Sequence, residues 1–236
     1  MSLLRGAVTA LLLGALVAAQ SGHEVRPSEV RFEPRFENEH ASVTTLDLPP
    51  GSFARAFQNT THDILWIALS DGDASFVRGT HDKMPAMFRA GDTRLFHSYE
   101  IASVANAGAS PLRSAVVQLK QHGLTSGGCG CSGESERAVC GCPGAAHLPL
   151  LWALAAGQIT LAGTRLDPGQ AFARAIRRED MLLVAITAAD LRDEAADNPD
   201  AATLHLASGD AAWIKAGRHQ FRNTGGAAAR FVTIEF

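Results

Sequence analysis

The chain of 236 residues contains one sequence pattern twice. The first copy begins with LDLPPGSFARAF at residues 46–57, and the second begins with RLDPGQAFARAI at residues 165–176. Each copy continues with an apolar run (DILWIAL, DMLLVAI), a Gly-Asp turn (AGDTRLF, SGDAAWI), an Asn-x-Gly turn (NAG, NTG) and a closing run (SAVVQLK, RFVTIEF). Corresponding features lie about 117 residues apart throughout. Five features in the same order indicate a duplicated domain.

The elements within each copy are short and rich in Val, Ile, Leu, Phe and Trp. Pro-Gly, Gly-Asp and Asn-x-Gly separate them, which is typical of short strands joined by turns. Only residues 148–156 and 188–197 have a helical pattern, and both can also be read as loop or strand. The sequence therefore predicts two all-β barrels or sandwiches of about 90 residues each.

The overall composition excludes some classes of protein. Apolar residues make up 46% of the chain, which is ample for a hydrophobic core. The formal net charge is −3, so the chain has no basic excess for binding nucleic acid.

The N-terminal residues 1–19 have the pattern of a signal peptide. Arg5 precedes an uncharged apolar run at residues 6–17, and the small residues of Val17-Ala18-Ala19 suit signal peptidase. A retained membrane anchor is the alternative, but the run is shorter than the roughly 20 residues that span a bilayer. We expect an exported protein, periplasmic or secreted, with no membrane contact beyond this segment.

Three segments resemble the cupins: ENEHASVTTLDLPPG (37–51), GDTRLFHSYEIASVANAG (91–108) and GDAAWIKAGRHQFRNTG (209–225). The resemblance implies an all-β fold of two tandem double-stranded β-helix (jelly-roll) barrels, that is, a bicupin. The expected order is a signal peptide (1–19), an N-terminal extension (20–34), a first barrel (35–121), a Cys-rich loop (122–147) and a second barrel (148–236).

Many cupins hold a divalent metal with two motifs, G-x5-H-x-H-x(3,4)-E-x6-G and G-x5-P-x-G-x2-H-x3-N. Two histidines two residues apart on a strand point to the same side, here into the barrel. In the first copy, the paired histidines are replaced by Asn59 and Thr61, or by Phe57 and Asn59. Ile101 or Ala102 stands at the histidine of the second motif. We therefore expect no standard metal site in the first barrel.

The second copy keeps more of these motifs. Counting back from the apolar run places Arg174 and Ile176, or Ala173 and Ala175, at the paired histidines, with Glu179 or Asp180 near the glutamate. His219, four residues before Asn223, matches the histidine of the second motif, although Lys215 replaces its proline. With His205 as a supplement, His219, Glu179 and Asp180 form a candidate metal site. The alternative is that His219 is a ligand-binding or structural residue.

Two arginines, Arg55 and Arg174, occupy the same repeated Ala-Arg-Ala context. An arginine inside a barrel would bind a carboxylate or another planar anion through paired hydrogen bonds. The alternative is that both arginines face solvent, because a shift of one residue reverses the face of a strand.

All four cysteines lie in the loop between the copies, with the spacing C-x-C-x8-C-x-C. On an antiparallel hairpin, Cys129 would oppose Cys142 and Cys131 would oppose Cys140, at a distance that disulfides can bridge. The same four thiolates could instead bind zinc. Export to an oxidising compartment favours the disulfides.

These observations favour an exported bicupin that binds a small molecule or has a structural role, and that has lost most of its metal ligands. Its expected ligand is small and anionic or polar, with contacts at His219, Glu179, Arg174 and Arg55. One alternative is a metal-dependent oxygenase, isomerase or lyase that uses the second barrel, and another is a redox or metal-handling protein that acts through the cysteine loop. No cofactor is certain, and a homodimer is compatible with the sequence.

Overall fold

Short strands make up the regular structure of both halves of the chain. The computed structural model describes residues 29–55, 61–78, 82–98, 100–120, 150–156, 159–172, 175–195 and 203–236. Within these ranges there are strands and turns and no helix, so the predicted all-β class is confirmed. In particular, no described segment is a helix with the length and apolarity needed to cross a membrane. The two stretches with a helical pattern contain strands instead.

The described strands of the first half are β1 (Arg31–Glu37), β2 (Ala41–Leu48), β3 (Phe53–Ala54), β4 (Asp63–Ala68), β5 (Gly72–Arg78), β6 (Asp82–Phe88), β7 (Thr93–Phe96), β8 (Ser103–Asn106) and β9 (Leu112–Leu119). They form a five-stranded sheet in the order β1-β2-β9-β4-β7 and a four-stranded sheet in the order β3-β8-β5-β6. All described neighbours pair antiparallel.

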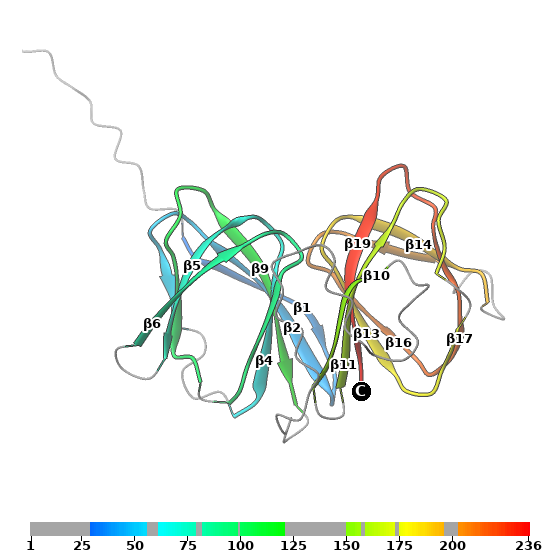
Figure 1. Cartoon of the computed structure of the whole chain (residues 1–236), viewed down its shortest axis with the longest axis horizontal. Coiled ribbons are helices and arrows are strands. Elements are labelled where there is room, and N and C mark those ends of the chain that lie inside the picture. Colours follow the sequence, from blue (N-terminus) through cyan, green and yellow to red (C-terminus); the bar gives the residue numbers. More distant parts are fainter. Residues whose placement is uncertain are drawn as a thin grey trace, which may run out of the picture.

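The described strands of the second half are β10 (Leu150–Ala156), β11 (Ile159–Leu166), β12 (Ala175–Arg177), β13 (Met181–Ala185), β14 (Ala189–Asp193), β15 (Thr203–Leu206), β16 (Ala211–Ile214), β17 (Gly217–His219), β18 (Phe221–Asn223) and β19 (Ala229–Glu235). They repeat the five-stranded sheet as β10-β11-β19-β13-β16, opposite the smaller sheets β15-β14-β18 and β12-β17. Each half thus folds into its own barrel, and the two barrels lie side by side (Figure 1).

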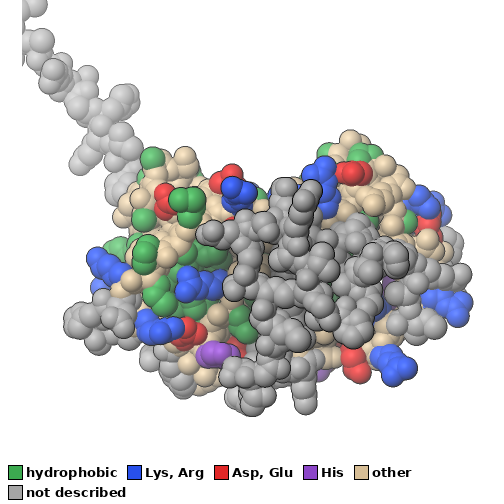
Figure 2. Space-filling model, in the orientation of Figure 1, with side chains coloured by type: hydrophobic (Ala, Val, Ile, Leu, Met, Phe, Trp, Pro, Cys, Tyr) green, Lys and Arg blue, Asp and Glu red, His purple; other side chains and the backbone are tan. Residues whose placement is uncertain are grey.

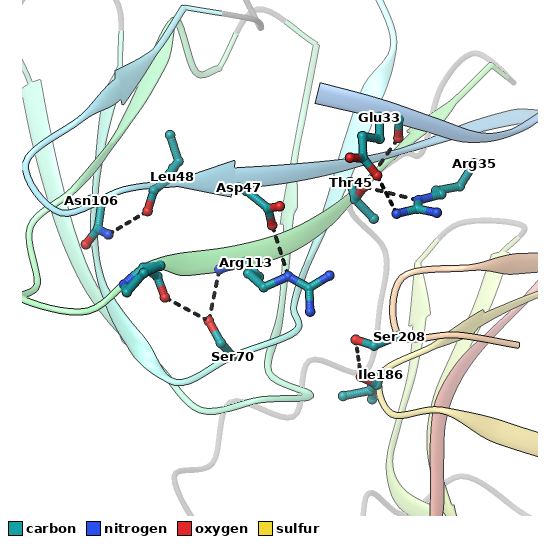
Figure 3. A network of polar contacts seen from close by, with 11 residues as sticks. Glu33, Arg35, Thr45, Asp47, Leu48, Ser70, Asn106, Arg113, Ile186 and Ser208 are labelled. Atoms are coloured by element: carbon teal, nitrogen blue, oxygen red, sulfur yellow. Dashed lines mark hydrogen bonds and ion pairs between the residues drawn. The ribbon is translucent and has the colours of Figure 1, made fainter. Parts of the chain in front are cut away.

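The repeat extends to individual hydrogen bonds, as the two Asn-x-Gly turns show. Asn106 is buried and donates from Nδ2 to the carbonyl oxygens of Leu48 and Ser110, both at 2.8 Å (Figure 3 shows the bond to Leu48). Its counterpart Asn223 donates to Leu166 and Ala227 at 2.9 and 2.7 Å. In both turns the amide two residues later donates back to the Asn Oδ1 at 2.9 Å. The same side chain therefore closes the same turn in each barrel.

The apolar runs of the sequence become strands that are buried on both faces. On β4 and β13 every residue is buried, which explains why their sequences are continuously apolar rather than alternating. One face of each strand points into its own barrel. The other face packs against the neighbouring barrel, in a shared core formed by Ala41, Val43, Leu65, Ile67, Leu69, Ala115, Val117, Leu119, Ile159, Leu161, Leu182, Val184, Ile186, Val232 and Ile234.

Two glycines allow the barrels to approach this closely. Gly91 and Gly209 occupy the same position of the two Gly-Asp turns, with φ angles of 96° and 91°. A Cβ on Gly209 would lie 2.4 Å from Thr45 Cγ2, and one on Gly91 would lie 2.7 Å from Arg230 Nη2. Figure 3 shows this region, with Thr45 of the first barrel near Ser208 and Ile186 of the second.

Polar and aromatic contacts join the barrels at the rim of this core. Arg35 of β1 donates to Asp210 at 3.3 Å, and Arg230 donates to the carbonyl of Ala90 at 2.6 Å. The ring of Trp213 stacks on those of Phe36 and His40, with centroids 6.0 and 5.3 Å apart. Both barrels therefore contribute to one continuous interface.

Candidate functional site

The interiors of the two barrels differ in chemistry. In the first barrel the inner face is aromatic: Phe76 lies 5.2 Å from Trp66, 4.7 Å from Phe96 and 5.9 Å from Phe88, measured between ring centroids. In the second barrel, apolar residues fill one end of the interior. Two ion pairs border these apolar residues, Arg177–Glu235 and His219–Asp193, and we call their four residues the polar end.

His219 points toward the interior from β17, with its ring stacked on that of the buried Phe221 at a centroid distance of 5.7 Å. Its Nδ1 contacts Asp193 Oδ2 at 2.6 Å, and its Nε2 contacts the carbonyl oxygen of Lys215 at 2.8 Å. A carbonyl and an ionised carboxylate can only accept, so both contacts are hydrogen bonds only when both ring nitrogens carry a proton. The ring is thus held from both sides.

Asp193 ends β14 and is the partner that orients this ring. Burial raises the pKa of its carboxyl, but hydrogen bonds from the Gln220 amide, His219 and the Ala195 amide outweigh burial. The resulting pKa lies below the ordinary value, and Asp193 is ionised at neutral pH.

Arg177 of β12 lies on the same side of the barrel wall as His219. It pairs in register with Gly217, which is two residues before His219 on β17. Its Nη1 forms an ion pair with Glu235 Oε1, from the inner face of β19. Both side chains are about a quarter exposed, at 27% and 26%, so solvent reaches this pair.

Comparison with known proteins rests on structure alone, because no family model and no curated protein sequence matches the chain. AerE from Microcystis aeruginosa is 11% identical with a TM-score of 0.65, over 90% of this chain and 94% of that one. A cupin 2 conserved barrel domain protein from Leptotrichia buccalis is 9% identical with a TM-score of 0.53, over 89% and 90%. A variant oxalate decarboxylase from Bacillus subtilis is 11% identical with a TM-score of 0.55, over 86% and 74%.

The chain has the cupin fold. This confirms the fold predicted from the sequence, a double-stranded β-helix barrel. The likeness spans most of each of these chains, and at this level of identity it is a likeness of fold.

The first cupin motif can also be counted forward from the Pro-Gly turn of the second copy. Counting forward from Gly169, Ala175 and Arg177 stand at the paired histidines and Met181 stands at the glutamate. Met181 is buried among apolar side chains, and Arg177 is a cation. A guanidinium does not coordinate metal ions, and a thioether is a weak ligand for divalent manganese, iron or zinc, so among these positions His219 retains the residue type of the motif.

The polar end does not fit a bound divalent metal. With Nδ1 directed at Asp193, only Nε2 of His219 could coordinate a metal, and Nε2 faces the carbonyl oxygen of Lys215 at 2.8 Å. Within the described ranges no group of three or more His, Cys, Asp or Glu side chains is arranged to hold a metal ion.

The structure does not bring together the four residues predicted as metal ligands. Asp180 lies just before β13, next to the inward-facing Met181, so it belongs to the outer face. There it accepts hydrogen bonds from Lys215 Nζ, the Ala216 amide and Trp213 Nε1, which lower the pKa of its carboxyl. Glu179 is exposed.

His205, the remaining predicted ligand, lies on the outside of the barrel. It pairs in register with Asp190 on the outer face of β14 and contacts that carboxylate at 2.8 Å, with 76% of its side chain exposed. Arg55, predicted as a ligand contact, is also exposed, with its guanidinium 5.3 Å from the ring of Phe53. Among the predicted site residues that the structure describes, His219 is thus the one that faces the interior.

Several predictions fall outside the described residues and stay predictions. They concern the signal peptide at residues 1–19, Arg174, and the four cysteines, Cys129, Cys131, Cys140 and Cys142.

Reasoning from the sequence missed three of the four residues of the polar end. Counting back from the apolar run left two registers open, residues 174 with 176 or residues 173 with 175, and neither register reaches Arg177. Counting forward from the Pro-Gly turn finds Arg177. Asp193 matches neither cupin motif, but it alternates with the apolar Ala189 and Leu191. Glu235 likewise alternates with the buried Phe231 and Thr233.

Proposed function

We propose that this protein is a non-catalytic binding protein whose second barrel holds a small anionic or polar ligand at the polar end. The observation that carries the proposal is Arg177, an interior guanidinium at a position where the cupin motif has a metal-binding histidine. Arginine presents a fixed positive charge and paired N–H donors to a carboxylate, without needing a metal.

The surroundings of Arg177 allow a ligand to reach it. Its side chain is 27% exposed, and its neighbour across the β12–β17 ladder is Gly217, over which the ring of His219 lies. Its present partner Glu235 is partly exposed, so a ligand carboxylate can replace that of Glu235 in the same ion pair.

His219 and Asp193 have a supporting role in this proposal. Their hydrogen bond joins β17 to β14, and the contact from His219 to Lys215 closes the turn that leads into β17. They therefore hold rigid the strand that lies beside Arg177, and a rigid site loses less entropy when a ligand binds.

Isothermal titration calorimetry with small carboxylates tests the proposal. Suitable probes are formate, oxalate, malonate and succinate; oxalate is included because an oxalate decarboxylase shares the fold. We expect one of them to bind with 1:1 stoichiometry, and Arg177→Met to weaken it by at least about tenfold, since a charge-assisted hydrogen bond contributes roughly 1.5–3 kcal/mol.

The matched control is Arg165→Met, which removes an exposed arginine that pairs with Asp167 on the same barrel. This variant should bind as the unaltered protein does. The proposal fails if none of the four probes binds, or if Arg177→Met and Arg165→Met bind equally well.

A further inference from the structure

A second interior cation lies in the first barrel, at Arg94 of β7. Arg94 pairs in register with Trp66 of β4 and is two residues before the buried Phe96, so it shares the inner face with both. Its Cζ lies 5.2 Å from the ring centroid of Phe96 and 5.6 Å from that of Phe76. The guanidinium therefore rests on the aromatic interior.

Arg94 connects the open edges of the two sheets. β7 is an edge strand of the five-stranded sheet, and β6 is an edge strand of the four-stranded sheet. From β7 the guanidinium extends to Phe76 on β5 and to Met84 on β6, with Nη2 3.9 Å from the sulfur. Arg94 thus lies at a border that no described backbone pairing closes.

Among the residues whose side chains the structure describes, a set that does not include Asp82 of β6, no carboxylate pairs with Arg94. Arg78 and Arg113, by contrast, form ion pairs with Glu100 and Asp47. The guanidinium of Arg94 instead contacts the rings of Phe76 and Phe96 and the sulfur of Met84. The residue is half-buried. An uncompensated cation in apolar surroundings attracts an anion more strongly than one in water does.

The side chains beside it are apolar. Met84 and Ala86 of β6 are partly buried and pack against the first-barrel core. They alternate with outward residues on β6, so they face the same interior as Arg94. Figure 2 shows hydrophobic side chains gathered with Lys or Arg on the visible face of the first barrel.

We propose that Arg94 anchors a second binding site, for a small monocarboxylate with an aromatic or branched apolar body. The guanidinium takes the carboxylate through paired hydrogen bonds, and Met84 and Ala86 contact the apolar body. A single cation matches a single negative charge, and an apolar wall disfavours a fully hydrated anion such as phosphate. This site differs from the polar end of the second barrel in both place and ligand.

Methyl NMR of methionine tests the proposal in the intact protein. The chain contains four methionines, of which Met84 lies at the proposed site and Met181 pairs in register with Glu235 of the polar end. Met87 is 83% exposed and serves as the surface reference. We expect phenylacetate to shift the Met84 methyl signal in a saturable way and to leave those of Met181 and Met87 in place.

Ligand controls on the unaltered protein keep the test independent of any variant. Phenylacetamide has the same body without the charge, acetate has the charge without the body, and inorganic phosphate is a different anion. Each should bind at least about tenfold more weakly than phenylacetate. Equal binding of phenylacetate and phenylacetamide would overturn the proposal.

Variants complete the test. Arg94→Met should abolish the Met84 shift and Arg94→Lys should weaken binding, whereas Arg89→Met, which removes an exposed arginine before the same strand, should change nothing. Arg177→Met should also leave phenylacetate binding unchanged, which separates this site from that of the proposed function. A phenylacetate shift at Met181 that Arg177→Met removes would place the ligand in the second barrel and overturn the inference.

Discussion

Two histidine–aspartate pairs in the second barrel have similar geometry and opposite environments. His219 and Asp193 have side chains 18% and 7% exposed, whereas His205 and Asp190 have side chains 76% and 51% exposed. We expect Asp193→Asn to lower the free energy of unfolding by about 1–3 kcal/mol, because His219 and two backbone amides lose a charged acceptor. Urea denaturation at pH 7 measures this change.

Asp190→Asn is the matched control. Exposed ion pairs contribute roughly 0–1 kcal/mol, so this variant should remain close to the unaltered protein. Equal losses in the two variants would show that the Asp193 pair is not a buried anchor of β17.

The stabilisation from Asp193 depends on pH in a definite direction. The pKa of its carboxyl is lower in the folded protein, so ionised Asp193 stabilises the fold above its ordinary pKa, and this contribution is lost as the pH falls through the lowered value. The difference in melting temperature between the unaltered protein and Asp193→Asn should therefore shrink as the pH falls below about 4. A difference that stays constant from pH 7 to pH 3 would contradict this assignment.

At the scale of the element, the repeated Asn-x-Gly turns make a quantitative prediction. Asn106→Ala and Asn223→Ala each remove two donors to carbonyl oxygens and one acceptor, at turns that are buried in both barrels. Each should cost about 2–4 kcal/mol in the free energy of unfolding, and the two losses should agree within about 1 kcal/mol. Chemical denaturation measures both, and a turn that tolerates alanine would contradict the structural equivalence of the copies.

The all-β class and the duplicated pattern of strands could be predicted from the sequence, because turn residues and apolar runs recur at a constant offset. The residues at the polar end could not. Motif spacing fixes the register of β12 only to within one residue. A shift of one residue moves every side chain of a strand from the interior face to the outer face. The two-residue spacing of Arg94 and Phe96 indicates in the sequence that both side chains share a face. The contact of Arg94 with Phe76 could not be predicted, because it depends on two sheets whose strands are far apart in sequence.

At the scale of the whole molecule, the close contact between the barrels depends on the Gly-Asp turns. Gly209 and Gly169 both have positive φ angles, 91° and 77°, but a Cβ on Gly169 would meet nothing within 4 Å, whereas one on Gly209 would overlap Thr45. Gly169→Ala should cost about 1–2 kcal/mol for the backbone alone. Gly209→Ala should cost about 1–3 kcal/mol more, because it also separates the barrels.

Thermal denaturation of the two variants measures this difference. A Gly209→Ala variant no less stable than Gly169→Ala would contradict the close packing of the barrels. The sequence shows that β4 and β13 are too apolar for a solvated face, but the identity of the surface that covers them is visible only in the structure.

The central claim is that the second barrel acts through Arg177 and not through a metal bound by His219. Elemental analysis by mass spectrometry of the purified protein tests it most directly, with His219→Gln as the comparison, because any metal at the cysteine loop is common to both proteins. The account predicts the same iron, manganese, cobalt, nickel and zinc content in the two proteins. One equivalent of any of these metals that is present in the unaltered protein and lost in His219→Gln would contradict it.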